Sequence, residues 1–280
     1  MIEFMKNANF NKIGWRFENS YCGLPQTLLS HVDRKPVIDP KLVYINKDLC
    51  RDLDLNIDKT SADLMAEIFS GNSLPDGAAS IAQAYAGHQF GYFTFLGDGR
   101  ALLIGEHKNK RNQKFDVQLK GSGKTPYSRN GDGKAALGPV LREYIISEAM
   151  HSLGVPTTRA LAVVKTGEKV FRESELEGAV LTRVASSHIR VGTFEFLAAS
   201  EDIASLRTLT KYSLKRHFPN KKIIKNCAIS LLESVIEKQA ELIIEWMRIG
   251  FVHGVMNTDN VTISGETIDY GPCAFMDKYN

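Results

Sequence analysis

Two carboxylates and a carboxamide near the C-terminal end are the residues best suited to chemistry. Asp259 stands beside Asn260, and Asp269 follows after the β-branched stretches 261–263 and 267–268. A carboxamide and a carboxylate at the two ends of a short hairpin can face one point, which is how kinase-like folds hold Mg²⁺ against nucleotide phosphates. Asp259 could then accept a proton. The alternative is a polar turn followed by a hairpin, because Asn and Asp are favoured in turns.

One lysine stands where it could reach a phosphate. Lys120 follows a strand expected at Phe115–Leu119 and precedes a glycine-rich segment. Its ammonium group could act as a point charge on a phosphate and be held by a carboxylate from the next helix, for which Glu143 and Glu148 both qualify. The competing interpretation is an exposed lysine at a sheet edge.

Glycine-rich segments follow that lysine. The segment Gly121–Thr125 resembles a P-loop, but the motif needs a glycine five positions before Gly123, where Gln118 stands, so we reject it. These glycines and those at 131–133 could still let backbone amides approach an anion.

Three arginines, Arg100, Arg183 and Arg190, are either solvated surface residues or contacts to a ligand. Arg183 and Arg190 lie near the end of an expected strand, where a chain crossing between two lobes would pass a cleft. His253 resembles the structural histidine of a kinase catalytic loop. The catalytic base of such a loop lies two residues further on, where this chain has Val255, and this argues against ordinary γ-phosphoryl transfer.

The first part of the chain must position these residues with strands. Residues 1–60 are polar and interrupted by prolines, and they predict an extended arm with one strand at Leu42–Ile45. Ala78–Gly87 predicts a short helix. Phe93–Gly105 predicts two strands joined by a tight turn at Asp98-Gly99, which is a strong hairpin signal.

The sheet is expected to continue with one inserted helix. Pro139–Leu153 predicts that helix, because Pro139 suits a first turn and Gly154 suits a C-terminal cap. Further strands are expected at Ala160–Val164, Lys169–Arg172 and Ala179–Val184.

From Phe194 onward the sequence becomes helical. Apolar residues recur at intervals of three and four and predict a long amphipathic helix that ends at Gly250: Ile229, Leu232, Ile236, Ala240, Ile243 and Met247. This order predicts an α+β, two-lobed protein-kinase-like fold. Residues 1–190 would form an arm and a strand-rich nucleotide-binding lobe, and residues 191–280 the start of a helical lobe with the catalytic and metal-binding loop.

Composition narrows the class of protein. Thirty-five basic and 32 acidic side chains leave a net charge of +3, which is too small to indicate nucleic acid or a membrane surface as a partner. Four widely spaced cysteines favour a reducing compartment. Residues 1–7 lack the apolar core of a signal peptide. The sequence has no run of about 18 apolar residues, which a membrane-spanning helix would need. We therefore expect a cytoplasmic protein.

Several segments together resemble the selenoprotein O family, the kinase-like protein adenylyltransferases called YdiU in bacteria. The matching strings are YAGHQFG at 85–91, LGDGR at 96–100, QLKGSGKTPYSR at 118–129, GDG at 131–133, REYIISEAM at 142–150, GVPTTR at 154–159, HGVMNTDN at 253–260 and IDYGP at 268–272. The resemblance covers nearly the whole chain.

The resemblance implies an activity and a set of roles. AMP, and UMP as well, would pass from a nucleoside triphosphate to Ser, Thr or Tyr hydroxyls of acceptor proteins, with release of pyrophosphate. ATP would bind in a flipped orientation, with its α-phosphorus facing the acceptor, and Mg²⁺ or Mn²⁺ would assist. Asp259 would accept the proton, Asn260 and Asp269 would hold the metal, and Glu143 would pair with Lys120, which leaves Glu148 a structural role. The nucleotide contacts would be Gly97, Gly99, Arg100, Lys120, Asp132, Gly133, Arg183, Arg190 and Asp269.

Members of this family continue well past the IDYGP segment, whereas the sequence stops at Asn280. The helical lobe would therefore be cut short. Two alternatives stay open beside the adenylyltransferase: a kinase-like phosphotransferase, and a non-catalytic nucleotide-binding fragment.

Overall fold

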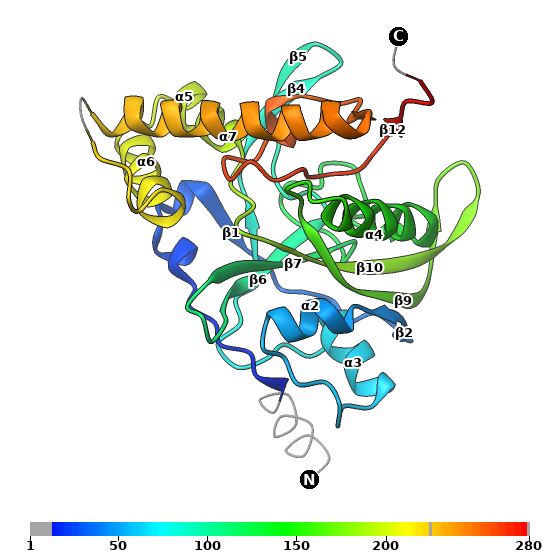
Figure 1. The fold of residues 1–280 in the computed structure, drawn as a ribbon. Coiled ribbons are helices and arrows are strands. Elements are labelled where there is room, and N and C mark those ends of the chain that lie inside the picture. Colours follow the sequence, from blue (N-terminus) through cyan, green and yellow to red (C-terminus); the bar gives the residue numbers. More distant parts are fainter. Residues whose placement is uncertain (1–12, 224–225, 279–280) are drawn as a thin grey trace.

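A large antiparallel sheet forms the centre of the molecule (Figure 1). The computed structural model describes residues 13–223 and 226–278. The strand order is β1-β3-β6-β7-β10-β9-β2, and β8 pairs with β10. The strands are β1 (Leu29–His31), β2 (Lys41–Ile45), β3 (Ile81–Gln83), β6 (Ala101–Lys108), β7 (Lys114–Lys120), β8 (Ala135–Ala136), β9 (Arg159–Phe171) and β10 (Glu175–Ala185). The architecture is thus mixed α/β, with a strand-rich sheet and several helices.

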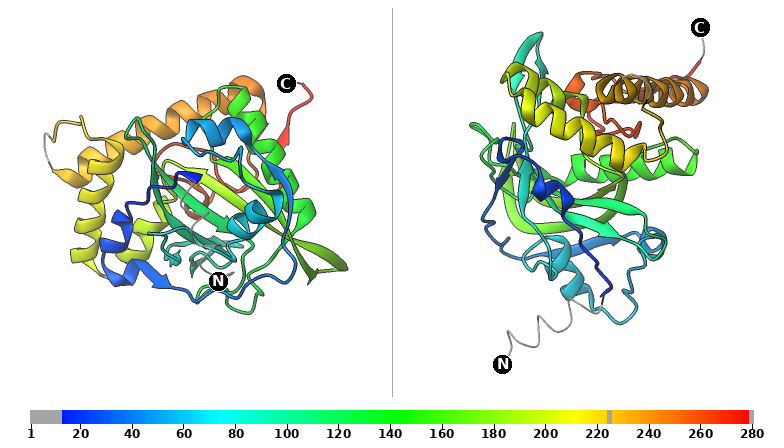
Figure 2. Two further views of the ribbon diagram at one scale, coloured as in Figure 1. Left: turned by 90° about the horizontal axis from the view of Figure 1, so that it is seen from below. Right: turned by 90° about the vertical axis from the view of Figure 1, so that its left-hand side faces the viewer.

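Helices cover both faces of this sheet, as the two further views in Figure 2 show. On one face α2 (Lys47–Asp52) and α3 (Ala62–Phe69) pack their apolar residues against Leu161 and Val164 of β9. On the other face α4 (Leu137–Ser152) packs Val140 against β9 and β10. The expected helix at Pro139–Leu153 is therefore confirmed.

The C-terminal part of the chain is mainly helical. It contains α5 (Val191–Ala199), α6 (Ile203–His217) and α7 (Cys227–Ile249), with α7 lying on the α4 side of the sheet (Figure 1). Asn226 caps α7 by accepting a hydrogen bond from the backbone N of Ile229 at 2.8 Å. Gly250 ends the helix with a left-handed φ of 69°.

Short elements complete the described chain. Two small sheets pair β4 (Ala86–Gln89) with β5 (Tyr92–Phe95), and β11 (Phe251–Val252) with β12 (Ala274–Phe275). Single 3-10 turns are η2 (Ser20–Gly23), η3 (Gln26–Leu28) and η4 (Thr258–Asn260). Within the described ranges, no helix combines the length and the apolar character needed to cross a bilayer.

The helix predicted at Ala78–Gly87 is wrong. That segment forms β3 and the start of β4. Ile81 pairs with Leu103 of β6, and Ala82 pairs with Ser30 of β1. Because Ile81 and Ala82 are fully buried between neighbouring strands, sheet pairing overrides the helix propensity of the alanines.

The hairpin predicted around Asp98-Gly99 is also wrong. Strand β5 pairs with β4, whereas β6 pairs with β3 and β7, so the two expected strands are not partners. The Asp98 side chain is buried and accepts hydrogen bonds from Gln83 N and Gln118 Nε2, both at 3.1 Å. Asp98 is thus an internal anchor whose Oδ2 is satisfied by two hydrogen bonds, and not a surface turn residue.

Two further expectations need correction. The arm contains the expected strand as β2, but it also contains β1 and α2, and its Leu28 and Leu53 are fully buried. Residues 1–12, which include the segment inspected for a signal peptide, lie outside the described residues. The strands expected separately at Ala160–Val164 and Lys169–Arg172 form one strand, β9, which continues past a register shift in its pairing with β10.

The long helix predicted from apolar periodicity is present as α7, but that periodic stripe is not its buried face. Leu232, Ile236 and Met247 are exposed, whereas Leu242 and Trp246 are buried. The helix therefore carries apolar residues on two sides. Periodicity identified the helix correctly, but it could not tell which of the two sides packs against the rest of the chain.

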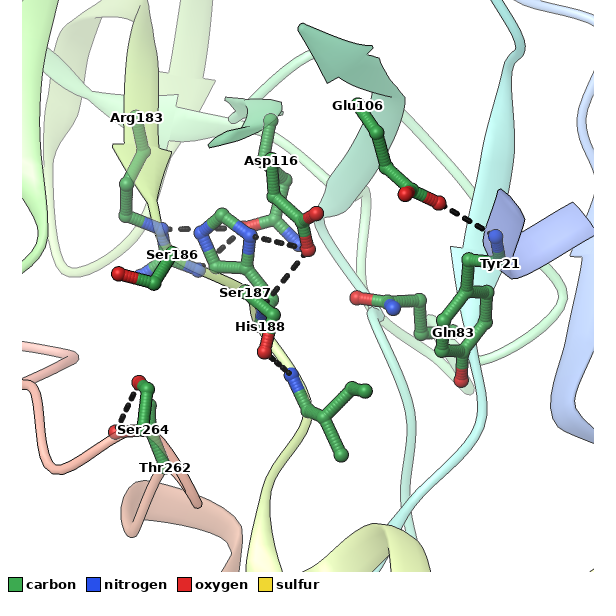
Figure 3. Close-up of polar contacts among 12 residues, drawn as sticks. Tyr21, Gln83, Glu106, Asp116, Arg183, Ser186, Ser187, His188, Thr262 and Ser264 are labelled. Carbon is green, nitrogen blue, oxygen red and sulfur yellow. Dashed lines mark hydrogen bonds and ion pairs between the residues drawn. The ribbon is translucent and has the colours of Figure 1, made fainter. Parts of the chain in front are cut away.

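Buried polar contacts anchor residues 186–190, the segment between β10 and α5 (Figure 3). His188 N donates to Asp116 Oδ2 at 2.8 Å, and His188 Nδ1 lies 3.4 Å from the same oxygen. Arg216 donates to the other Asp116 oxygen at 2.6 Å. Ser186 N and Oγ both donate to the carboxylate of Glu266. These contacts fix the segment that leads to Arg190.

We expect the contribution of His188 to the free energy of unfolding to fall as the pH drops from about 6.5 towards 4. Burial, helped by the charges of Arg183 and Arg190, lowers the pKa of His188 from 6.5 to about 4. Between these values the unfolded chain binds a proton that the folded chain excludes. The stability contributed by neutral His188 is therefore present above pH 6.5 and lost towards pH 4, by about 3 kcal/mol in full.

Urea denaturation at several pH values between 7.5 and 4, on the wild type and His188→Gln, measures this effect. The variant should show a shallower loss, whereas His31→Gln, at an exposed histidine, should behave as the wild type. An equally steep loss in His188→Gln would contradict the assignment.

Candidate functional site

Three cations and two carboxylates from distant parts of the chain meet at one point. Lys120 Nζ donates to Glu143 Oε2 at 2.7 Å and to Asp269 Oδ1 at 2.6 Å. Arg183 NH1 donates to Asp269 Oδ1 at 2.6 Å and to Glu143 Oε1 at 3.2 Å. Arg190 NH1 donates to Asp269 Oδ2 at 2.6 Å. Asp269 is therefore the shared partner of all three cations.

The pairing of β7 with β10 positions two of these cations. Lys120 lies opposite Leu181, and Gln118 lies opposite Arg183. Because side chains alternate between the faces of a strand, Gln118, Lys120 and Arg183 share one face of the sheet. Helix α4 crosses that face with Glu143 directed at Lys120.

The electrostatics of the cluster keep Asp269 ionised. Arg183 and Arg190 are buried. Burial acts to raise the pKa of Asp269, but Lys120, Arg183 and Arg190 outweigh it and hold that pKa well below its usual range. The cations outnumber the two carboxylates to which they are directly hydrogen-bonded, so the cluster is suited to an incoming anion.

Three residues that the sequence did not point to hold the arginines in place. Gln118 Oε1 accepts hydrogen bonds from Arg183 Nε, at 3.1 Å, and from its NH2. Gln118 in turn donates to Asp98, whose Oδ1 lies 3.8 Å from Arg190 NH2. The Arg190 guanidinium lies over the Tyr85 ring, 4.5 Å from its centroid. The available signal was the polar residue Gln118 inside the expected strand, two positions before Lys120.

The loop with Asp259 and Asn260 adjoins the cluster. Both residues lie in η4, and the backbone oxygen of Asp259 accepts from Arg190 NH1 at 2.7 Å. Asp259 Oδ1 is buried and has no hydrogen-bond partner among the described residues, and burial raises the pKa of this carboxyl group. Asn260 donates its Nδ2 to Val255 O at 3.2 Å, which uses the amide nitrogen and not the oxygen.

The donor set fits a hard divalent cation. In residues 13–223 and 226–278, no group of three or more His, Cys, Asp and Glu side chains gathers as a metal cage. Asn260 and Asp269 would supply two oxygen ligands, and Mg²⁺ is often bound by one or two protein carboxylates with phosphate oxygens and water. Asp269 would be released for this role when phosphates become the partners of Lys120 and the arginines.

Three of the predicted glycines are required by close packing. A Cβ on Gly97 would clash with the ring of Tyr127, and one on Gly99 would lie 2.9 Å from the Tyr127 carbonyl oxygen. Gly133 has a φ of 70°, and a Cβ there would clash with the carbonyl of Gly123. The glycine-rich segments thus pack against one another.

Two other predicted nucleotide contacts stand apart from the cluster. Asp132 is exposed and forms a two-bond ion pair with Arg172, at 2.9 and 3.0 Å, which lowers the pKa of Asp132. Arg100 is exposed just before β6. In the part of the chain that the structure describes, neither side chain is hydrogen-bonded or ion-paired to Lys120 or Asp269.

The remaining candidates have structural partners. Among the described residues, no hydrogen bond or ion pair joins Glu148 to Lys120; Glu148 forms an ion pair with Arg159 at 2.8 Å and accepts from Ala160 N at 2.8 Å. His253 is buried, pairs through Nε2 with Ile268 O at 2.8 Å and stacks on Trp246.

A family model described as "Protein adenylyltransferase SelO" matches residues 12–280. The chain belongs to the SelO family. The resemblance found in the sequence segments is therefore confirmed.

Curated SelO relatives carry the name "Protein nucleotidyltransferase YdiU". The protein from Pelagibacter ubique (strain HTCC1062) is 60% identical over 96% of this chain and 56% of its own length. The protein from Geobacillus kaustophilus (strain HTA426) is 61% identical over 95% of this chain and 55% of its own length. The chain thus spans about half the length of the curated relatives it matches.

A solved structure of ROP2 from Toxoplasma gondii, a virulence factor described as having a protein-kinase fold and no enzymatic activity, is also similar. It is 11% identical and covers 68% of this chain and 53% of that chain, with a TM-score of 0.28. A TM-score of 0.28 is too low to infer the fold or the function of this SelO chain from ROP2.

Proposed function

We propose that this chain binds ATP and belongs to a protein adenylyltransferase with a two-lobed, kinase-like architecture divided near residue 190. The enzyme would transfer AMP, and UMP as well, to Ser, Thr or Tyr hydroxyls of acceptor proteins. The observation that carries this proposal is the convergence of Lys120, Arg183 and Arg190 on Asp269, next to the Asp259–Asn260 loop. Preorganised cations of this kind stabilise the charge of a reacting polyphosphate.

The residues divide the work between binding and positioning. Lys120, Arg183 and Arg190 would bind phosphate oxygens, with Glu143 orienting Lys120. Gly97, Gly99, Arg100, Asp132 and Gly133 would contact the nucleotide from the surrounding loops. Asn260 and Asp269 would hold Mg²⁺ or Mn²⁺, which when bound neutralises phosphate charge.

Asp259 would accept the proton of the acceptor hydroxyl. As the hydroxyl oxygen bonds to the α-phosphorus, the bond from that phosphorus to the bridging oxygen breaks and pyrophosphate leaves. The buried Oδ1 of Asp259, which has no hydrogen-bond partner in the part of the chain that the structure describes, and the raised pKa of its carboxyl group support this role.

The position of Val255 supports nucleotidyl transfer over phosphoryl transfer, because the ordinary kinase base would stand there. The relatives' name, nucleotidyltransferase, supports the same choice. All four cysteines are unpaired, which supports a cytoplasmic location.

Incubation of the chain and a mixture of proteins with Mg²⁺ and ATP labelled at the α or the γ position tests the proposal. We expect label on protein only from the α position. Label from the γ position alone would indicate a phosphotransferase, and ATP binding without transfer would indicate a non-catalytic module; either result overturns the proposal.

A further inference from the structure

The hairpin formed by β4 and β5, residues 86–95, carries four exposed aromatic side chains that the proposed chemistry does not use. Phe90 is fully exposed, and Tyr92, Phe93 and Phe95 are 78%, 42% and 52% exposed. This aromatic hairpin projects beyond α7 at the top of Figure 1. Aromatic residues gathered this way on one short element indicate a contact surface more than scattered exposure does.

Phe90 occupies a position that hairpin folding does not favour. Phe90 and Gly91 form the two-residue turn, with φ angles of 52° and 85°. Two positive φ angles correspond to a type I′ turn, which prefers Asn-Gly because a bulky side chain is strained in the left-handed region. The fully exposed Phe90 ring gains no packing against the described residues to offset this cost. Its side chain is thus unexplained by local structure.

The base of the aromatic hairpin is fastened to the loop that carries Asp259. Asn257 Nδ2 donates to His88 O at 2.7 Å. A Cβ on Gly87 would clash with the Asp259 carboxylate, so the two segments are in direct contact. The hairpin therefore borders the residue proposed to accept the proton.

The pleat of the hairpin determines which of its residues lie on the face directed towards Asp259. Gly87 pairs with Thr94, and Gln89 pairs with Tyr92. Because alternate residues share a face, Tyr92 lies on the face that Gly87 turns towards Asp259, two pairs closer to the tip. A polypeptide that presents a hydroxyl to Asp259 from this side would pass Tyr92 and Phe90.

We propose that the aromatic hairpin docks the acceptor polypeptide, with Phe90 and Tyr92 packing against apolar side chains that flank the acceptor hydroxyl. This inference rests on the proposed adenylyltransferase function. In the described residues β5 pairs with β4 alone, so its other edge is open to an extended segment that adds a strand. The aromatic rings then supply the preference for apolar neighbours.

Peptide binding tests the docking separately from catalysis. The probe is a fluorescent peptide, Ala-Phe-Ala-Ser-Ala-Phe-Ala, compared with a version in which both Phe are Asn. Anisotropy is measured on the whole chain with Mg²⁺ and a non-hydrolysable ATP analogue. We expect the wild type to bind the Phe peptide roughly tenfold more tightly than the Asn peptide.

Phe90→Asn should lose most of that preference. Because Asn-Gly suits the type I′ turn better than Phe-Gly, the variant removes the ring without unfolding the hairpin. Phe171→Asn is the matched control, since Phe171 is also an exposed phenylalanine, at 69%, and ends β9. It should bind both peptides as the wild type does.

Transfer of label from α-labelled ATP to the same peptides completes the test. We expect Phe90→Asn to lower kcat/KM for the Phe peptide about tenfold with the KM for ATP unchanged. Equal binding of both peptides by the wild type, or an unaltered preference in Phe90→Asn, overturns the docking. Transfer to both peptides with equal kcat/KM also overturns it while leaving the proposed function standing. An aromatic preference without any AMP transfer overturns the proposed function and the acceptor role together.

Discussion

Replacing Asp269 with alanine should abolish nucleotide transfer while leaving the chain folded. The substitution removes the only carboxylate proposed as a metal ligand, and loss of metal stabilisation of the reacting phosphates costs several kcal/mol, or roughly 10³-fold or more in rate. AMP incorporation from α-labelled ATP in the presence of Mg²⁺ measures the loss.

The fold should survive because the cations that Asp269 binds have other partners. Lys120 and Arg183 also contact Glu143. Arg190 also donates to the Asp259 backbone oxygen. Circular dichroism and thermal unfolding show directly whether the Asp269→Ala variant is folded.

Asp269→Asn provides a second variant with a smaller structural change. Asp269 has a φ of 60°, a conformation that asparagine tolerates better than alanine does. The Asp269→Asn substitution keeps the size of the side chain and removes its charge, so nucleotide transfer should also be lost. Unchanged AMP incorporation by both variants would remove the metal assignment.

Asp259→Asn should lower kcat by about 10² to 10⁴-fold and leave the KM for ATP nearly unchanged. The amide cannot accept the hydroxyl proton. The expected loss in kcat corresponds to the contribution that a general base makes. Nucleotide binding should persist, because Arg190 contacts the backbone oxygen of Asp259, which the substitution retains.

Steady-state kinetics at varied ATP and fixed acceptor protein separate the two constants for Asp259→Asn. A large rise in the KM for ATP with kcat preserved would place Asp259 in nucleotide binding. Wild-type kcat and KM together would mean that another group, or solvent, takes the proton.

The sequence was sufficient for elements whose signals are local. Helix α4 was predicted because Pro139 and Gly154 mark its ends, and α7 because apolar residues recur at helical spacing. The position of Lys120 at the end of a strand followed from the alternation of apolar and polar residues at Phe115–Leu119. Such patterns reflect propensity and periodicity within one segment.

The sequence could not predict features that depend on pairing between distant segments. The dipeptide Asp98-Gly99 is typical of a surface turn, yet Asp98 is buried beside Gln83 and Gln118. Arg183 was as plausible on the surface, but its strand partner and α4 enclose it. Helix α7 carries apolar residues on two sides, and only the packing of Leu242 and Trp246 identifies the buried one.

The central claim is that Lys120, Asn260 and Asp269 serve one metal ion and one triphosphate. A crystal structure of the chain with Mn²⁺ and a non-hydrolysable ATP analogue, with data collected at a wavelength where manganese scatters anomalously, tests it most directly. We expect an anomalous peak about 2.1 Å from oxygens of both Asn260 and Asp269, with Lys120 on a phosphate of the same nucleotide. A manganese peak elsewhere, or a nucleotide bound away from Lys120, would contradict it.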